Sequence, residues 1–244
     1  MSMIGVLGGM GPAATVDFLD KVVRLTPASR DQEHIPVIAA SLPHVPDRSA
    51  FILGTGKDPL PNLLRGIDLL NDMRVGVVVV PCNSSHHWYD ELCARSKAPV
   101  LHIAQACVER IVQPRGSRVL VLATRGALRS GFYQRELAKV GLLAMAPDVN
   151  LIQPLVDDCI RQVKSGALEE AGVSLSRVLA LAREMAISAV IMGCTEIPIA
   201  ARYCQASGME LSDSSLALAQ AAVNYAVERR WHLAMTDVEQ QELS

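Results

Sequence analysis

Short runs of apolar, β-branched residues alternate along this sequence with longer amphipathic stretches. Val77–Val80 and Ala189–Met192 are apolar at every position, which is typical of strands buried on both faces of a parallel sheet. We predict strands at Ile4–Leu7, Val37–Ser41, Val75–Val80, Val119–Leu122, Ala189–Met192 and Met209–Leu211. We predict helices at Pro12–Leu25, Pro59–Met73, Ser85–Arg95, Ser130–Val140, Pro154–Ser165, Leu168–Met185 and Ser214–Arg229. This alternation favours a doubly wound α/β fold, with mostly parallel sheets covered by helices.

The sequence also contains an approximate internal repeat. Gly5–Pro12 resembles Val119–Gly126, since each combines a strand, a glycine-containing loop and the start of a helix. Val77–Ser84 resembles Ala189–Glu196, since each is a buried strand followed by a small residue, a cysteine and a polar residue. We therefore predict two pseudo-symmetric lobes with a shared cleft, residues 1–103 and 104–207. A C-terminal helix over about 208–232 packs back on the first lobe, and residues 235–244 form a solvated tail.

Composition excludes several classes of function. The formal net charge is −2, so the chain lacks the basic field expected of a nucleic-acid-binding protein. No apolar run approaches the roughly 20 residues that a membrane-spanning helix needs. The first residues lack the basic region and the long apolar stretch of a secretory signal, so we expect a cytoplasmic protein.

Six cysteines are spread through the chain without a Cys-x-x-Cys pair. We expect neither a disulfide framework nor a metal site, because Cys82, His86 and His87 are only a fragment of a ligand set. The histidines are better explained as packed or surface residues than as proton relays. We expect the other four cysteines to be structural: Cys93, Cys107, Cys159 and Cys204.

Cys82 and Cys194 occupy a special position because both directly follow a predicted strand. In open α/β sheets, ligands bind beyond the carboxyl ends of the strands. The start of a helix there stabilises a thiolate. Inverting a stereocentre requires a base on one face of the carbon and an acid on the other. A thiolate and a thiol on opposite sides of one cleft meet that requirement.

Four segments resemble a known family: Gly8-Gly-Met-Gly-Pro-Ala-Ala-Thr15, Pro46-Asp-Arg48, Pro81-Cys-Asn83 and Gly193-Cys-Thr-Glu-Ile-Pro198. They are similar to the signature segments of the aspartate/glutamate racemase family, nearest its aspartate racemase branch. The Asp-Ser-Gly opening of the glutamate racemase branch is absent. The resemblance covers residues 4 to about 215. It implies two α/β lobes, a homodimer and cofactor-independent (PLP-independent) racemisation of an acidic amino-acid substrate by two cysteines.

The resemblance also implies roles for individual residues. Cys82 and Cys194 match the catalytic pair, Arg48 matches a carboxylate-binding arginine, and Lys164 matches a substrate-binding lysine. A guanidinium and an ammonium suit a substrate with two carboxylates. Further substrate contacts are expected from Gly9, Met10, Asn83, Ser84, Thr124 and Thr195, and from Glu196, which orients donors or tunes a thiol.

Two features leave alternatives open. Aspartate racemases commonly continue Pro-Cys-Asn with Thr-Ala-His, whereas this chain reads Ser84-Ser-His-His-Trp88, which reshapes the pocket. Aspartate is the expected substrate, with glutamate or a broader range left open. A related isomerase or decarboxylase reaction on another small carboxylate or a hydantoin also stays open, and so does non-catalytic binding of a small acid. The Gly8–Gly11 loop does not fit a dinucleotide motif, and the strand Val37–Ser41 ends without the acidic residue that a ribose requires.

Overall fold

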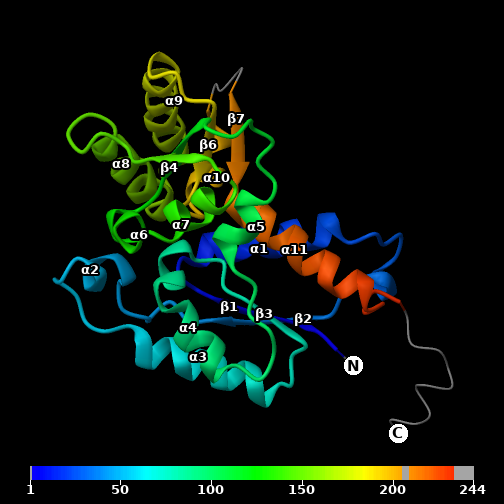
Figure 1. Cartoon of the computed structure of the whole chain (residues 1–244). Helices are drawn as coiled ribbons and strands as arrows, with labels where there is room; N and C mark the ends of the chain where they lie inside the picture. The colour runs from blue at the N-terminus through cyan, green and yellow to red at the C-terminus, as the bar shows by residue number, and fades with distance from the viewer. Residues whose placement is uncertain (1, 205–208, 234–244) are drawn as a thin grey trace, which may run out of the picture.

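The computed structural model describes residues 2–204 and 209–233, and within them seven strands form two separate parallel sheets (Figure 1). The first sheet has the order β2-β1-β3, and the second has the order β5-β4-β6-β7. The strands are β1 (Ile4–Gly8), β2 (Val37–Ser41), β3 (Val77–Val79), β4 (Arg118–Leu122), β5 (Leu143–Met145), β6 (Ala189–Met192) and β7 (Glu210–Asp213). We call the part built on the first sheet the N-terminal lobe, and the part built on the second sheet the C-terminal lobe.

The strand order explains the repeat in the sequence. β1 and β4 are the equivalent inner strands, and each pairs in parallel on one side with the strand that follows it, β2 or β5. On its other side each pairs with the strand that leads to a cysteine, β3 or β6. The two lobes therefore share the arrangement that the matched segments predict.

Helices connect the strands, and most lie close to their predicted ranges. The α-helices are α1 (Pro12–Leu25), α2 (Arg48–Ile52), α3 (Leu60–Asp72), α4 (Tyr89–Arg95), α5 (Ile103–Val108), α6 (Arg125–Ser130), α7 (Phe132–Lys139), α8 (Gln153–Lys164), α9 (Leu168–Glu184), α10 (Ile197–Ala201) and α11 (Ser214–Glu228). Two 3₁₀ helices, η1 (Asp31–Glu33) and η2 (Asn83–Trp88), complete the set. The short helices α2, α5, α6 and α10 were not predicted, because five or six residues carry too little periodicity.

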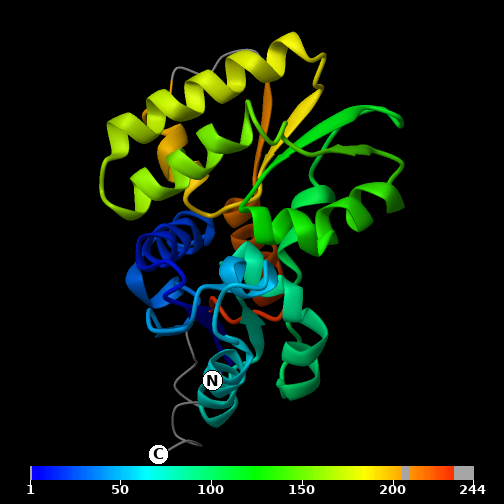
Figure 2. The same cartoon turned by 90° about the vertical axis from the view of Figure 1, so that its left-hand side faces the viewer.

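Each sheet is buried on both faces, and this confirms the α/β class. In the N-terminal lobe, Ile4 and Val6 of β1 pack into one core with α1 and α11, while Leu7 packs with α3 on the other face. In the C-terminal lobe, Leu120 of β4 packs with α8 and α9, while Val121 packs with α7. Figure 2 shows the two lobes one above the other.

The last helix belongs to the core of the N-terminal lobe, although it follows the last strand of the C-terminal lobe. Its residues Leu218 and Val223 share a core with Phe18 of α1. The helix lies close to its predicted bounds Ser214–Arg229, and the wider range 208–232 is too long because Glu210–Asp213 forms β7 in the second sheet, near the strand predicted at Met209–Leu211. The boundary between residues 103 and 104 stays a prediction, and the tail predicted at 235–244 lies outside the described residues. No described helix combines the length and the apolar character needed to cross a bilayer.

Candidate active site

One small cavity between the lobes collects most of the predicted site residues. It has a volume of about 40 Å³ and lies at the carboxyl ends of the strands. Both cysteines line it, Cys82 from the segment after β3 and Cys194 from the segment after β6. The other lining residues are Met10, Asp47, Arg48, Ser49, Asn83, Ser84, Thr124, Lys164, Thr195 and Glu196. Gly9 lies outside this cavity and lines an adjoining groove of about 520 Å³, which shares Met10, Arg48 and Lys164 with it.

His86 holds the backbone of Cys82. Its Nε2 accepts a hydrogen bond from the Ile103 N–H over 3.1 Å, so Nδ1 carries the proton and donates to the Cys82 carbonyl over 3.1 Å. Burial, together with the neighbouring His102, lowers the pKa of His86 to about 3. The ring is therefore neutral near pH 7 and has no free nitrogen to relay a proton. It fixes Cys82 instead.

Cys194 has a different environment. Its Sγ donates to Glu196 Oε2 over 3.0 Å, and Thr195 Oγ1 reaches the same oxygen over 3.5 Å. All three side chains are buried. Burial raises the pKa of Cys194 well above its usual range, and the charge of Glu196 raises it further, against the opposing effect of Lys164. Cys194 therefore rests as a thiol.

Arg48 presents an unused donor edge in the cavity wall. Its Nη1 donates to the carbonyls of Val45 and Pro46, and its Nη2 donates to the carbonyl of Met10. The remaining nitrogen, Nε, is buried and has no partner among the described residues. Nε and the second N–H of Nη2 form one edge of the guanidinium, which is the geometry that binds a carboxylate through two hydrogen bonds.

Lys164 lies at the end of α8 and lines both the cavity and the groove. Loss of solvation opposes the charged form, but electrostatic interaction with the nearby acidic groups, Glu196 foremost, raises the pKa of Lys164 above its ordinary value. The ammonium therefore stays charged. It places a second cation beside the cysteines, from the lobe opposite Arg48.

Asn83 is anchored between the lobes. Its Oδ1 accepts from the Tyr133 hydroxyl over 2.6 Å, and its Nδ2 donates to Ser214 Oγ over 3.1 Å. A second pair of side chains, Ser84 and Thr124, crosses the cavity with hydroxyl oxygens 2.9 Å apart. These bonds fix the two lobes around the cysteines, and they leave one N–H of Asn83 for a ligand.

The Gly8–Gly11 loop is held by its own helix. Thr15 Oγ1 accepts from the Gly9 N–H over 2.8 Å and donates to the Gly11 carbonyl over 3.0 Å. Gly9 has φ of +88°, and a Cβ there would lie 2.2 Å from the Leu42 nitrogen. The N–H of Gly9, one of the residues expected to contact a substrate, is therefore used inside the loop.

Sequence reasoning missed three residues of this region. Asp47 and Ser49 flank Arg48 in the cavity wall. Asp47 accepts a hydrogen bond from the Ala50 N–H and so stabilises the start of α2. Ser49 accepts one from the Gly126 N–H and so joins the two lobes. An aspartate after proline is a helix-start signal that could have indicated Asp47. No local signal indicates Tyr133, because its partner is 50 residues away.

The remaining cysteines lie away from the cavity. Cys107 and Cys159 are buried in the cores of the C-terminal lobe, while Cys93 and Cys204 pack at the edges of cores. No group of three or more His, Cys, Asp or Glu side chains suited to a metal ion occurs among residues 2–204 and 209–233.

Two parallel α/β lobes place one cysteine each in a common cavity, and the comparisons with known proteins assign this arrangement to the racemases. The chain belongs to the Asp/Glu/Hydantoin racemase family, which matches residues 7–222. It is 28% identical over 229 residues to the broad specificity amino-acid racemase RacX of Bacillus subtilis, covering 91% of this chain and 97% of that protein. It is 26% identical over 152 residues to a Helicobacter pylori glutamate racemase, covering 60% of this chain and 57% of that enzyme.

Structural comparison gives the same family. The Picrophilus torridus aspartate racemase superposes with a TM-score of 0.82 and 26% identity, covering 96% of this chain and 100% of that one. The Francisella tularensis glutamate racemase has a TM-score of 0.70 at 18% identity, covering 97% of this chain and 84% of that one, and therefore supports the fold.

Proposed function

We propose that this racemase inverts the α-carbon of an acidic amino acid between Cys82 and Cys194. The observation that carries the proposal is that both cysteines line one cavity from opposite lobes. One thiolate removes the α-proton, and the C–H electron pair moves onto the α-carboxylate. The other thiol then gives its proton to the opposite face of the carbon. The step is redox-neutral, and it leaves the two sulfurs with exchanged protonation states.

The cations around the cavity support this chemistry. The free edge of Arg48 binds the α-carboxylate, which gains negative charge as the proton leaves, so this contact is stronger in the transition state than in the ground state. Lys164 binds the side-chain carboxylate. The resting thiol at Cys194 leaves Cys82 as the base for one enantiomer.

Entry of the substrate requires the lobes to move apart. A cavity of about 40 Å³ has room for roughly three water molecules. An amino acid has more non-hydrogen atoms than that and does not fit in the cavity as it stands. The adjoining groove supplies the path, because it opens to solvent and shares cavity residues with the site.

The test is racemisation without PLP under reducing conditions, followed by chiral chromatography for each enantiomer of aspartate, glutamate and a panel of neutral amino acids. We expect inversion, with both Cys82→Ser and Cys194→Ser lowering the rate by about 10²- to 10⁴-fold. Cys93→Ser, outside the cavity, should leave it unchanged. No turnover of any amino acid by the unmodified chain would overturn the proposal, and full activity of one cysteine variant would favour a one-cysteine reaction.

We also propose that the active form is a cytoplasmic homodimer. Sedimentation equilibrium of the purified chain tests the stoichiometry, and a single species with the 26.3 kDa mass of the monomer would contradict it.

A further inference from the structure

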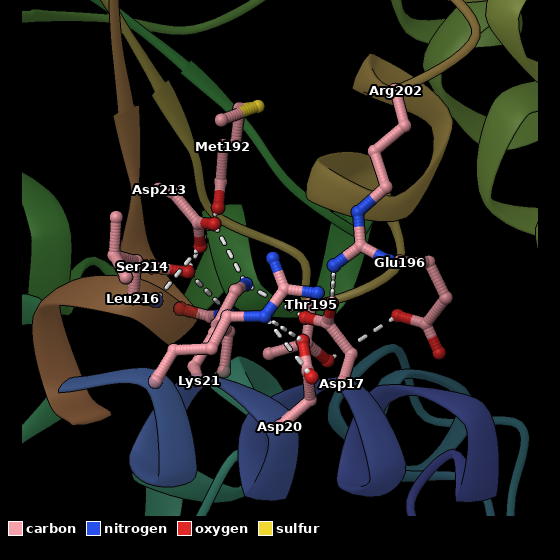
Figure 3. A network of polar contacts seen from close by, with 12 residues as sticks. Asp17, Asp20, Lys21, Met192, Thr195, Glu196, Arg202, Asp213, Ser214 and Leu216 are labelled. Carbon is pink, nitrogen blue, oxygen red and sulfur yellow. Dashed lines mark hydrogen bonds and ion pairs between the residues drawn. The ribbon is translucent and has the colours of Figure 1, made fainter. Parts of the chain in front are cut away.

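A chain of mostly buried charged side chains joins the two lobes beside the candidate active site (Figure 3). Asp17 and Lys21 lie one turn apart on α1 and are 6% and 8% exposed. Lys21 Nζ lies 2.6 Å from Asp17 Oδ2 and 2.7 Å from Asp213 Oδ2. The other oxygen of Asp17 pairs with Arg202. We call these four residues, Asp17, Lys21, Arg202 and Asp213, the interlobe clamp.

The composition of the interlobe clamp suggests a role in position rather than in stability. Its two acids and two bases balance in charge; the side chains of Asp17, Lys21 and Asp213 are largely buried, while that of Arg202 is half exposed. Removing two ions from water costs several kcal/mol each, and well-packed apolar residues often stabilise a protein as much as a buried pair does. The best-attested use of buried ion pairs is to select one arrangement of the elements that carry them. Here those elements belong to different lobes.

On the C-terminal lobe, the interlobe clamp holds the segment that carries Cys194. Asp213 ends β7 and is the register partner of Met192, the last residue of β6, which lies two residues before Cys194. Arg202 directly follows α10, the helix that begins after Glu196. The two partners of α1 therefore lie on both sides of the Cys194–Glu196 segment.

On the N-terminal lobe, the interlobe clamp holds a helix that starts at the cavity. α1 begins directly after Met10 and Gly11, and Met10 lines the cavity. A Cβ at Gly11 would lie 3.3 Å from Glu196 Oε1, so the start of α1 closely approaches the partner of Cys194. A shift of α1 against β7 and α10 would change this approach.

We propose that Asp17 and Lys21 are positioning residues, which hold Cys194 in place to face Cys82. Neither side chain lines the cavity, so they act through the segments they join. The inference rests on the proposed two-cysteine racemisation. The lobes also meet through neutral bonds, such as Tyr133 to Asn83 and Ser84 to Thr124, so a variant of the interlobe clamp keeps its two lobes associated.

The test compares Asp17→Asn with Asp20→Asn. Both changes remove one carboxylate charge from α1, but Asp20 is a solvent-exposed partner of Arg24 outside the interlobe clamp. Each variant is incubated in D2O with each enantiomer of the best substrate. Inversion is measured by chiral chromatography, and exchange of the α-proton is measured by NMR. Circular dichroism and the melting temperature show that the compared variants are folded at the assay temperature.

We expect Asp17→Asn to lower racemisation by about 10- to 100-fold, the effect of misplacing a reacting group by about 1 Å. For the enantiomer that Cys82 deprotonates, exchange should persist, because Cys82 can return deuterium to the same face. The ratio of exchange to inversion should therefore rise for one enantiomer only. General destabilisation would lower both processes in proportion, and Asp20→Asn should match the unmodified enzyme.

Two further variants keep the test decisive. Arg202→Gln changes a half-exposed side chain and should also raise the ratio of exchange to inversion. It takes the place of Asp17→Asn if that variant does not fold. Asp17→Glu restores the charge and should recover most of the rate. An unchanged ratio in folded Asp17→Asn or in Arg202→Gln would overturn the inference. If the unmodified chain racemises nothing, the proposed function fails instead.

Discussion

Cys194 donates a hydrogen bond to Glu196 Oε2 over 3.0 Å, and both side chains are buried in the wall between the lobes. No equivalent carboxylate follows Cys82, where the chain continues with Asn83 and Ser84. The two matched cysteine segments therefore provide two different environments for sulfur. The pseudo-symmetric sheets bring the cysteines together, and the residues beside them make their protonation states unequal.

Glu196→Gln should shift the pH dependence of racemisation. The carboxylate raises the pKa of Cys194, so removing its charge lowers that pKa toward the ordinary value. The active enzyme needs one thiol and one thiolate, so activity declines at high pH when the remaining thiol ionises. We expect the alkaline limb of a plot of kcat/KM against pH to move to lower pH. An alkaline limb that stays in place would contradict this, and Glu169→Gln, a change at an exposed residue of α9, serves as the control.

Arg48→Lys should weaken substrate binding although the charge is kept. An ammonium cannot reproduce the Nε and Nη2 edge, nor the three bonds to the carbonyls of Val45, Pro46 and Met10. Loss of one charge-assisted hydrogen bond costs about 1.5–3 kcal/mol, so KM should rise about 10- to 100-fold. Steady-state kinetics measure KM, with Arg129→Lys, a change at an exposed residue of α6, as the matched control. A KM equal to that of the unmodified enzyme would rule out this role.

Tyr133→Phe should lower both the free energy of unfolding and the rate of racemisation. The variant leaves Asn83 Oδ1 without its donor in a buried site, which costs about 1–3 kcal/mol in the free energy of unfolding. Because Asn83 directly follows Cys82, we also expect kcat to fall. Urea denaturation and initial rates check both effects against Tyr203→Phe, a change on a half-exposed ring. Unfolding and kinetics equal to those of the control would show that the bond is dispensable.

His86 should make the protein less stable in mild acid. Its pKa is about 3 in the folded state and about 6.5 in the unfolded state. Between pH 3 and pH 6.5 the side chain is therefore protonated in the unfolded chain and neutral in the folded chain. The free energy of unfolding therefore falls as pH falls through this window, by up to about 1.4 kcal/mol per pH unit. His102, with a pKa lowered to about 4 by burial and by Lys139 and Arg135, contributes in the same direction.

Denaturation of His86→Gln between about pH 5 and 7 measures this contribution, since the variant should lose the part of the slope due to His86 and keep the part due to His102. His44→Gln changes an exposed histidine and should keep the full slope. A His86→Gln protein with the slope of the unmodified chain would mean that His86 is not the group responsible.

Local pattern was enough to predict the long elements and the edge of the sheet where the site lies. Pro12–Leu25 is a helix at its predicted bounds, since proline at its start and apolar residues one turn apart act within a single segment. The cysteines and Arg48 share a cavity because parallel strands direct the segments that follow them to one edge, and Lys164 reaches the same cavity from the end of α8. The sequence alone thus determined the α/β class, the repeat and most cavity residues.

Contacts between distant segments were decided only by the tertiary structure. Tyr133 meets Asn83, and Lys21 meets Asp213, through the way the lobes pack, and no spacing in the chain encodes either pair. The N–H of Gly9 is taken by Thr15, which residue type alone does not predict. Periodicity and motifs report what one segment does by itself, whereas a hydrogen bond or an ion pair between lobes depends on the position of two segments at once.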